Sequence, residues 1–261
     1  MTATPLGNAE PSAEKRSPAK QYVPRSKVVQ RLLSLFDEPS YLEVGVSRGV
    51  TFHAVKARRK VAVDPVFDFD WQTEQEKRRD TTTYHQVTSD EYFGSIIGEG
   101  ERFDVIFLDG LHTFEQTLRD LLNALDHLSE GGIIVIDDVR PSSYHASLPD
   151  HLQSVRVRQW VKGDNKDWMG DVYRLLWFID TFCQQLTYRT VSNNHGVAVV
   201  WRQRRSSVVE RSVRTTAELS FEDFVLQQDV LSLAPFGKIF REIRALREPA
   251  GADPSGIDAT G

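Results

Sequence analysis

Short apolar runs alternate with amphipathic stretches along the first half of the chain. The apolar runs, together with one segment rich in Thr and Tyr, predict strands at 41–45, 60–64, 81–87, 103–109 and 133–137. The stretches between them have apolar residues at helical spacing and predict helices at 26–36, 50–59, 90–97 and 113–128. Strands that are almost wholly apolar and alternate with helices indicate a parallel sheet covered on both faces.

The second half of the chain does not continue the alternation of strand and helix. Residues 168–186 predict a helix, and the segments 186–191 and 196–203 predict two strands on either side of the turn sequence SNNHG. Residues 206–247 look mostly helical. We therefore expect an α/β fold with a doubly wound, mostly parallel, seven-stranded Rossmann-like sheet, a closing antiparallel hairpin and a helical C-terminal appendage.

The composition of the two ends differs from that of the middle. Residues 1–20 and 248–261 are rich in small, polar and Pro residues without periodicity, so we expect disordered tails there. Between them we expect a ligand-binding domain at 21–205 and a helical extension at 206–247. The apolar stripes at 221–246 would either cover the site or form a homo-oligomer interface, and the sequence does not decide between the two.

Charge and cysteine content narrow the class of protein. A net charge of −5 and a pI of about 5.8 argue against a nucleic-acid partner, so we interpret Arg202, Arg204 and Arg205 as a solvated strand end. The single cysteine, Cys183, excludes an internal disulfide. The sequence has no apolar run of about 18 residues and its start has no apolar core of a secretory signal, so we expect no membrane partner and a cytoplasmic location.

The turn after the first strand, in YLEVGVSRGVTF, is the first candidate binding element. Gly45 and Gly49 allow positive φ and close approach of a ligand, and Glu43 and Ser47 stand beside them. The spacing is not that of a dinucleotide loop, and a carboxylate at this place favours a positively charged ligand over a phosphate. The alternative is that the glycines only make a tight turn.

Acidic and hydroxyl residues follow the next two strands. Asp64 ends the second strand about 20 residues after the loop, where an acid typically binds ribose hydroxyls, although it could also serve as a turn residue. Ser89 and Asp90 follow the third strand, where they would meet an adenine edge or act as a helix cap. Together these residues favour an adenosine that carries positive charge and no phosphate, which describes S-adenosylmethionine.

Three carboxylates end the fourth and fifth strands. Asp109 ends one strand and Asp137 and Asp138 end the other, and neighbouring strands lie roughly 5 Å apart. Carboxylates packed this closely would repel one another unless a cation such as Mg²⁺ lies between them. The alternative is that Asp137 or Asp138 caps the next segment or pairs with Arg140.

Residues 38–203 resemble the class I S-adenosylmethionine-dependent methyltransferases. The resemblance is carried by the loop from Glu43 to Gly49, by Asp64 and by the final hairpin. It implies cofactor contacts from the following residues: Glu43, Gly45, Ser47, Gly49, Asp64, Ser89, Asp90 and Asp109.

Within that class, FDVIFLDGLHTFEQ and LSEGGIIVIDDV look like the sub-family that contains bacterial O-methyltransferases of macrolide sugars and related natural products. Those enzymes bind a divalent cation, usually magnesium, through an Asp-Gly-x-His stretch and a following acidic pair. The resemblance therefore implies that Asp109, Asp137 and Asp138 hold the metal.

His112 follows Asp109 at the ligand-binding edge of the sheet. An imidazole can accept a proton at neutral pH, so we expect His112 to be the general base, with Asp109 as the alternative base. The expected reaction is direct methyl transfer to a hydroxyl of a small molecule, such as a sugar or natural product. The alternatives are a metal-independent N- or O-methyltransferase, a non-catalytic S-adenosylmethionine-binding protein and, more distantly, a nicotinamide oxidoreductase.

The long connection at 139–171 is the expected acceptor side. It offers aromatic and ionisable side chains that suit a sugar ring or simple loop packing, and Tyr22 in the segment 20–25 is a further candidate contact. Those side chains are Tyr144, His145, His151, Trp160, Trp168 and Asp171. The acceptor, the position methylated, the need for metal, the oligomeric state and the role of the C-terminal helices stay open.

Overall fold

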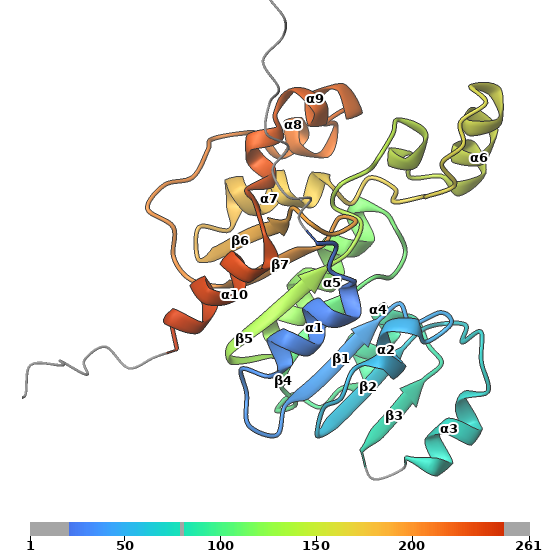
Figure 1. Ribbon diagram of the computed structural model, residues 1–261, viewed down its shortest axis with the longest axis vertical. Coiled ribbons are helices and arrows are strands. Elements are labelled where there is room, and N and C mark those ends of the chain that lie inside the picture. Colours follow the sequence, from blue (N-terminus) through green and yellow to red (C-terminus); the bar gives the residue numbers. More distant parts are fainter. Residues whose placement is uncertain (1–20, 79–80, 248–261) are drawn as a thin grey trace, which may run out of the picture.

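The computed structural model describes residues 21–78 and 81–247, so the two tails expected to be disordered lie outside the described residues. In this part of the chain one sheet has the order β3-β2-β1-β4-β5-β7-β6-β8 (Figure 1). Its strands are β1 (Ser40–Val44), β2 (Arg59–Val63), β3 (Thr82–His85), β4 (Phe103–Leu108), β5 (Leu128–Ile136), β6 (Leu186–Val191), β7 (Ala198–Arg202) and β8 (Leu233–Ala234).

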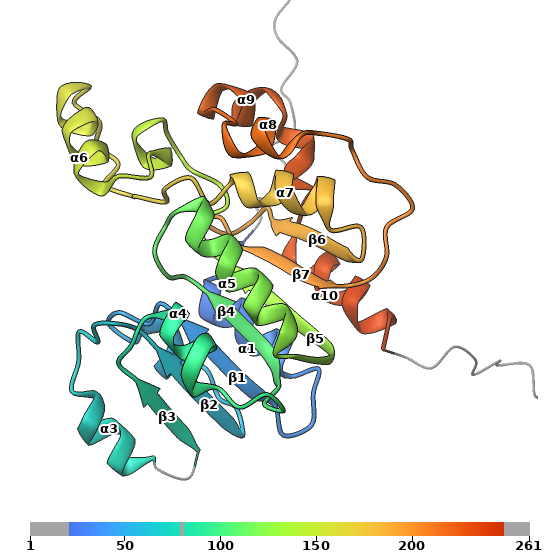
Figure 2. The same ribbon diagram turned by 180° about the vertical axis from the view of Figure 1, so that it is seen from behind.

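Helices cover both faces of this sheet, as the two opposite views show (Figures 1 and 2). They are α1 (Arg25–Leu33), α2 (Val50–Ala54), α3 (Trp71–Lys77), α4 (Ser89–Glu91), α5 (Phe114–Asp126), α6 (His151–Trp160), α7 (Arg174–Phe182), α8 (Val213–Ala217), α9 (Phe221–Leu226) and α10 (Phe236–Ala245). A π-helical turn at Tyr92–Ile96 and two 3₁₀ turns, at His145–Ser147 and Gln228–Leu231, complete the elements.

The strand register confirms the expected fold class. β1 lies parallel between β2 and β4, with Val44 opposite both Val63 and Leu108, whereas β7 runs antiparallel to β5 and β6. The described sheet has one strand more than we expected, because Leu233–Ala234 pairs with the end of β6. A strand of two residues has no periodicity to detect, so β8 could not be predicted from the sequence pattern.

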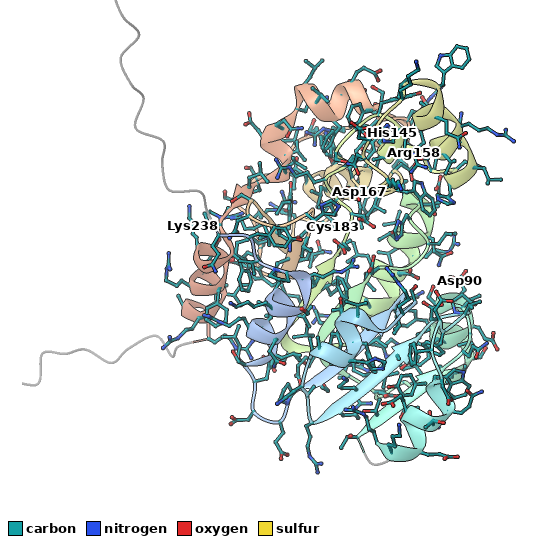
Figure 3. All side chains as sticks on the ribbon, turned by 45° about the vertical axis from the view of Figure 1, so that its right-hand side comes forward. Asp90, His145, Arg158, Asp167, Cys183 and Lys238 are labelled. Atoms are coloured by element: carbon teal, nitrogen blue, oxygen red, sulfur yellow. The ribbon has the colours of Figure 1, made fainter. Side chains whose placement is uncertain are left out.

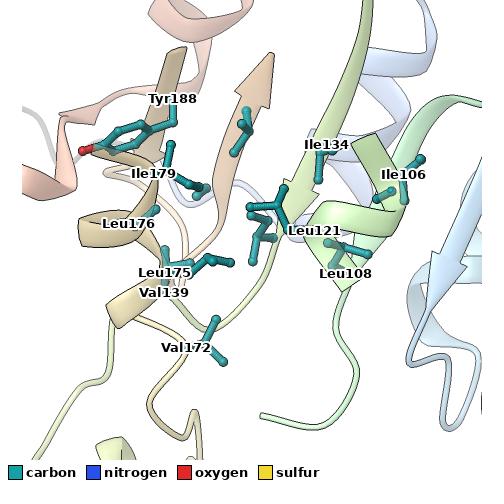
Figure 4. Close-up of a cluster of buried hydrophobic side chains, with 14 of the residues drawn as sticks. Ile106, Leu108, Leu121, Ile134, Val139, Val172, Leu175, Leu176, Ile179 and Tyr188 are labelled. Carbon is teal, nitrogen blue, oxygen red and sulfur yellow. The ribbon is translucent and has the colours of Figure 1, made fainter. Parts of the chain in front are cut away.

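Adjacent residues of each central strand pack into opposite layers of the core. In β4, Ile106 and Leu108 face the layer of α5 and α7, where Figure 4 shows them near Leu121 and Ile134. Val105 and Phe107 face the layer of α1, α2 and α10. Since both faces are buried, the central strands are apolar throughout rather than alternating.

The helix expected at 168–186 begins later, at Arg174. The residues before it form turns in which Gly170 has φ 60°, and a Cβ there would lie 1.6 Å from the His112 carbonyl oxygen. This close approach to a distant segment keeps residues 168–173 out of the helix, which therefore starts late. The helix expected at 50–59 is also short and ends at Ala54, where Lys60 Nζ binds the carbonyl oxygens of Phe52 and Val55.

The connection 139–171 and the C-terminal segment pack differently. The connection contains α6, which projects from the body of the molecule (Figures 1 and 2). The C-terminal segment folds back on the sheet layers: Phe224 of α9 contacts Tyr173 and Trp177, and Arg31 of α1 lies 4.4 Å from the ring centre of Phe240 in α10. Much of the apolar surface at 221–246 is therefore used inside the chain, and the homo-oligomer stays a prediction.

The arginines after β7 are not simply a solvated strand end. Arg205 is largely buried, pairs with Asp180 at 2.8 Å and donates to the carbonyl oxygens of Ile179, Asp180 and Cys183 at the end of α7. That interpretation was wrong for Arg205, because its side chain is held by an ion pair and by carbonyl oxygens at the C-terminal end of α7. No helix in the described ranges is both long enough and apolar enough to cross a membrane.

Candidate active site

The glycine loop lies where the strand order reverses, between β1 and β4. Gly45 has φ 86°, and a Cβ on it would lie 1.9 Å from the Asp109 carbonyl oxygen. Gly49 has φ 72° and precedes the first turn of α2. The two glycines are thus required by backbone conformation and, at Gly45, by contact with the chain after β4. Ligands of doubly wound sheets bind at such a crevice.

The Asp64 carboxylate holds this loop. Its Oδ2 accepts hydrogen bonds from the N–H groups of Val46 at 2.7 Å and Ser47 at 2.8 Å, and its Oδ1 accepts from Val66 N at 2.8 Å. Asp64 therefore serves as a turn residue, which was the alternative we left open. It also lines the cavity above the loop, so a ribose contact stays a prediction.

A cavity of about 550 Å³ lies above the ends of β1, β2 and β4. Its volume is in the range of small-molecule sites. Seven of the eight expected cofactor residues line it, and Gly49 does not; the seven are Glu43, Gly45, Ser47, Asp64, Ser89, Asp90 and Asp109.

Gln116 lines this cavity beside Ser89 and Asp90, although it was not among the expected cofactor residues. Gln116 of α5 donates from Nε2 to Ser89 Oγ at 3.1 Å and to Asp90 Oδ1 at 3.0 Å. The helix cap is neither Ser89 nor Asp90 but Thr88, whose side chain accepts from Glu91 N. Figure 3 labels Asp90 at this side of the molecule.

Glu43 differs from the charged group that we expected. It is buried, and the Tyr41 hydroxyl donates to its Oε2 at 2.5 Å. Burial raises the pKa of Glu43 to about 8, against the opposing effects of the Tyr41 hydrogen bond and of Lys60. At neutral pH its carboxyl group is therefore mostly protonated, so Glu43 does not present a full negative charge to the cavity that it lines.

The three carboxylates after β4 and β5 do lie together, but they divide into two groups. Asp137 accepts a close ion pair from Arg25 Nη1, which also contacts Asp109 Oδ2 at 3.0 Å. Asp109, Asp138 and His112 form the other group, with ligand atoms all within 4.8 Å of one another. Among the described residues His112 groups with Asp109 and Asp138, whereas an Asp137 oxygen pairs with Arg25 rather than with Arg140. The expected metal set of Asp109, Asp137 and Asp138 stays a prediction.

Mutual repulsion and burial act on these carboxylates. Burial, followed by the charges of Asp137 and Asp138, raises the pKa of Asp109 well above its usual value, and Arg25 opposes this. Burial and the charge of Asp137 likewise raise the pKa of Asp138. Asp138 also has φ 62°, a conformation that non-Gly residues rarely adopt and that is common at functional sites.

His112 is fixed by the connection on the acceptor side. Its Nδ1 lies 3.0 Å from the Trp168 carbonyl oxygen and 3.1 Å from Asp138 Oδ2, its ring stacks on Trp168, and its Nε2 lies 3.7 Å from Asp109 Oδ1. Burial lowers the pKa of His112, so the ring is neutral at pH 7. The carbonyl can only accept, so we assign the proton to Nδ1, which leaves the Nε2 lone pair facing Asp109.

A second cavity, also of about 550 Å³, lies on the other side of His112. Tyr22, Asp137, Asp138, Trp168 and His195 are among its lining residues, as is Asp167, which Figure 3 labels and which pairs with His195 at 3.2 Å. The two cavities share five lining residues: Arg25, Arg48, Val50, Thr51 and His112. Of the aromatic candidates in 139–171, only Trp168 reaches this cavity, and Trp160 is almost fully exposed on α6.

Arg25 and the turn at 193–195 are the site residues that the sequence did not indicate. The turn reaches the site because Asn194 Oδ1 accepts from Gly196 N, and the Gly196 carbonyl accepts from Val139 N next to Asp138. A basic residue in the segment 20–25 was the only available signal for Arg25, and nothing local links it to carboxylates more than 80 positions away.

Residues 42–139 match the model of a family described as a methyltransferase domain. The match contains the glycine loop, Asp64 and all three carboxylates, and the strand order with an antiparallel β7 agrees with it. Residues 42–139 are therefore similar to a methyltransferase domain. A comparison with curated proteins found no match for this chain.

Solved structures similar to this chain include an O-methyltransferase, TomG, from Streptomyces achromogenes, in complex with SAM (15% identity, 67% of this chain and 78% of that chain, TM-score 0.41). An O-methyltransferase from Bacillus cereus in complex with SAH is also similar (15% identity, 71% and 84%, TM-score 0.43). So is the N-methyltransferase NodS from Bradyrhizobium japonicum WM9 (15% identity, 69% and 94%, TM-score 0.42).

Proposed function

We propose that this protein is a class I methyltransferase that transfers a methyl group from S-adenosylmethionine to a hydroxyl group of a small molecule, such as a sugar or natural product, with help from a divalent cation such as Mg²⁺. The observation that carries the proposal is the pair of adjoining cavities. One lies on the glycine loop and the other on the carboxylates, and His112 stands in the wall between them. A donor in the first cavity and an acceptor in the second would meet at this wall.

The first cavity suits S-adenosylmethionine. The loop held by Asp64 brings backbone close to a ligand, and Ser89, Asp90 and Gln116 offer donors and acceptors for an adenine edge. The exposed acidic side chain of Asp90 and the ionisable carboxyl of Asp109 lie at its rim, where an ammonium or sulfonium is stabilised by negative charge. These features support the cofactor and do not depend on a metal.

The residues beside the second cavity fit a divalent cation. Asp109, Asp138 and His112 offer two carboxylate oxygens and one imidazole nitrogen, and the backbone strain at Asp138 aims its carboxylate at the other two. When bound there, a divalent cation would supply Lewis acidity toward an acceptor hydroxyl. Trp168 fixes the orientation of His112 in the way that second partners commonly orient histidine ligands.

The proton of the acceptor hydroxyl has two candidate destinations. His112 has one free lone pair, on Nε2, which can accept a proton or bind a cation but not both. Asp109 faces both groups of the centre and has a raised pKa, which suits it to accept a proton. We therefore propose His112 as the base when no metal is bound, with Asp109 as the alternative base.

One observation favours the metal-independent alternative. Arg25 already neutralises part of the negative charge of the centre, so the carboxylates are not without a counter-cation. In that case the acceptor nucleophile is an oxygen or a nitrogen, oriented by Asp137 and Asp138. The cytoplasmic location is also part of the proposal, and the single cysteine, Cys183, is in keeping with it.

Calorimetry tests the cofactor first. S-adenosylmethionine should bind the purified protein and NAD should not; binding of NAD alone would contradict the proposal. Production of S-adenosylhomocysteine is then measured against a panel of hydroxylated and amine acceptors. With an active acceptor, excess EDTA should remove activity and added Mg²⁺ should restore it. Full activity in EDTA would select the metal-independent alternative.

A further inference from the structure

Arg25 is a cation placed inside the carboxylate centre. Its Nη1 contacts one oxygen of Asp109 and one oxygen of Asp137 at the same time. The guanidinium lines both cavities, and the charges of Asp109, Asp137 and Asp138 all raise its pKa. Arg25 thus occupies the side of the centre that Asp137 would otherwise offer to a metal.

The position of Arg25 in its helix is not explained by local preference. It is the first residue of α1, which has no acidic residue in its first turn. The helix macrodipole disfavours a cation at this end. An unfavourable local position indicates that the long-range contact with the carboxylates decides where Arg25 lies.

The chain before Arg25 is held against the same centre. Val23 N donates to the Asn193 carbonyl oxygen at 2.8 Å, Asn193 Nδ2 donates to the Gln21 carbonyl oxygen at 2.8 Å, and Asn194 Nδ2 donates to Val23 O. These bonds anchor the segment 21–24 to the turn beside Asp138. The guanidinium is therefore presented by a fixed backbone.

Charge counting shows what this cation does to the centre. Asp109, Asp137 and Asp138 carry three negative charges when ionised, and Arg25 offsets one of them. The remaining two match a single divalent ion at Asp109, His112 and Asp138. Without Arg25 the same carboxylates would attract a divalent cation more strongly, because Coulomb attraction grows with the uncompensated charge.

We propose that Arg25 is a resident cation of the carboxylate centre, which keeps Asp137 out of any metal site and lowers the affinity of the centre for a divalent cation. This deepens the proposed function, because it concerns the same centre, and it makes Arg25 a positioning residue for Asp137. The proposal is tested by cation binding and does not need a known acceptor.

The experiment is calorimetric titration of the full chain with Mn²⁺ and Mg²⁺, without other ligands. Arg25→Gln should bind the cation at least about tenfold more tightly than wild type. Arg25→Lys, which keeps the charge, should stay within about threefold of wild type. Lys27→Gln is the matched control, since it removes one exposed positive charge from the same helix, and it should change affinity by less than about twofold.

Two carboxylate variants provide a second arm that leaves Arg25 in place. Asp138→Asn removes a proposed ligand and should weaken Mn²⁺ binding at least about thirtyfold, whereas Asp137→Asn should weaken it by no more than about fivefold. The melting temperature with and without Mn²⁺ measures cation binding independently of calorimetry. Mn²⁺ should raise the melting temperature of Arg25→Gln by more than that of wild type, because it replaces the missing cation.

Each other outcome overturns the proposal. Equal Mn²⁺ affinity in wild type and Arg25→Gln, or no binding by either, would reduce Arg25 to a structural ion pair. Asp137→Asn losing as much affinity as Asp138→Asn would make Asp137 a ligand. Failure of S-adenosylmethionine to bind wild type would instead refute the proposed function, and the Mn²⁺ comparison could still be read.

Discussion

The cofactor side and the acceptor side of this site are built in different ways. On the cofactor side the glycine loop, Asp64 and the residues after β3 come from successive strand ends, and Asp64 binds backbone N–H groups of the loop itself. On the acceptor side the carboxylates meet Arg25, Trp168 and His195 from three distant segments. The first side depends on short-range backbone geometry and the second on long-range charge pairing, so the two should respond differently to substitution.

A substitution on the acceptor side should cause the largest effect, and this effect should be on turnover and not on cofactor affinity. His112→Ala removes both the candidate base and a candidate ligand, so turnover should fall by about 10²–10⁴ while the affinity for S-adenosylmethionine stays within about threefold. Single-turnover formation of S-adenosylhomocysteine and calorimetry measure the two quantities. His151→Ala is the control, because the His151 ring also contacts Trp168 but lines neither cavity. Unchanged turnover in His112→Ala would remove His112 from the mechanism.

The cofactor side should fail through its backbone. Gly45→Ala places a Cβ against the Asp109 carbonyl oxygen at a positive φ, so the free energy of unfolding should fall by about 3 kcal/mol or more and cofactor binding should be lost. Urea denaturation measures the change. Gly94→Ala is the matched control, since a Cβ there meets nothing within 4 Å, and it should change stability by less than about 1 kcal/mol. Equal effects of the two would contradict the role of Gly45.

Glu43 connects the two sides and should make stability depend on pH. Burial raises the pKa of Glu43 in the folded state to about 8, above its ordinary value of 4.5, so between these values the folded state holds a proton that the unfolded state has lost. This contribution to stability is full below pH 4.5 and is lost as pH rises toward 8. Glu43→Gln should flatten the fall between pH 5 and 7.5, which we expect to be about 1–3 kcal/mol. Urea titrations at the two pH values measure it, and a variant with an unchanged slope would exclude Glu43 as the cause.

Substitution of Asp64 should cause the smallest effect, and this effect should be limited to cofactor binding. Asp64→Asn leaves one acceptor oxygen and turns an amide toward N–H groups of the loop, so affinity for S-adenosylmethionine should fall by about tenfold. Mn²⁺ affinity should stay unchanged. Asp68→Asn is the control, because the Asp68 carboxylate accepts a hydrogen bond from the exposed Ser47 hydroxyl at 3.3 Å and lines neither of the two cavities. A loss of Mn²⁺ binding in Asp64→Asn would break the separation of the two sides.

Features that depend on local sequence patterns could be predicted, whereas features that depend on contacts between distant residues could not. The central strands could be predicted because both of their faces are buried, and so could the carboxylate at the end of β4. The late start of the helix expected at 168–186 could not be predicted. It results from the packing of Gly170 on His112, which lies more than 50 positions earlier in the chain. The protonation of Glu43 and the capping role of Arg205 also depend on burial and on partners that no local pattern reveals.

The sequence by itself determined the alternation of strands and helices, the glycine loop and the placing of acidic residues at strand ends. Hydrophobic periodicity and the conformational freedom of glycine are local properties, and parallel strands place their ends at one edge. Only the tertiary structure decided which cation each carboxylate meets. Electrostatic contacts join residues that are close in space, and the folded chain brings Arg25 to Asp137 and His112 to Asp138.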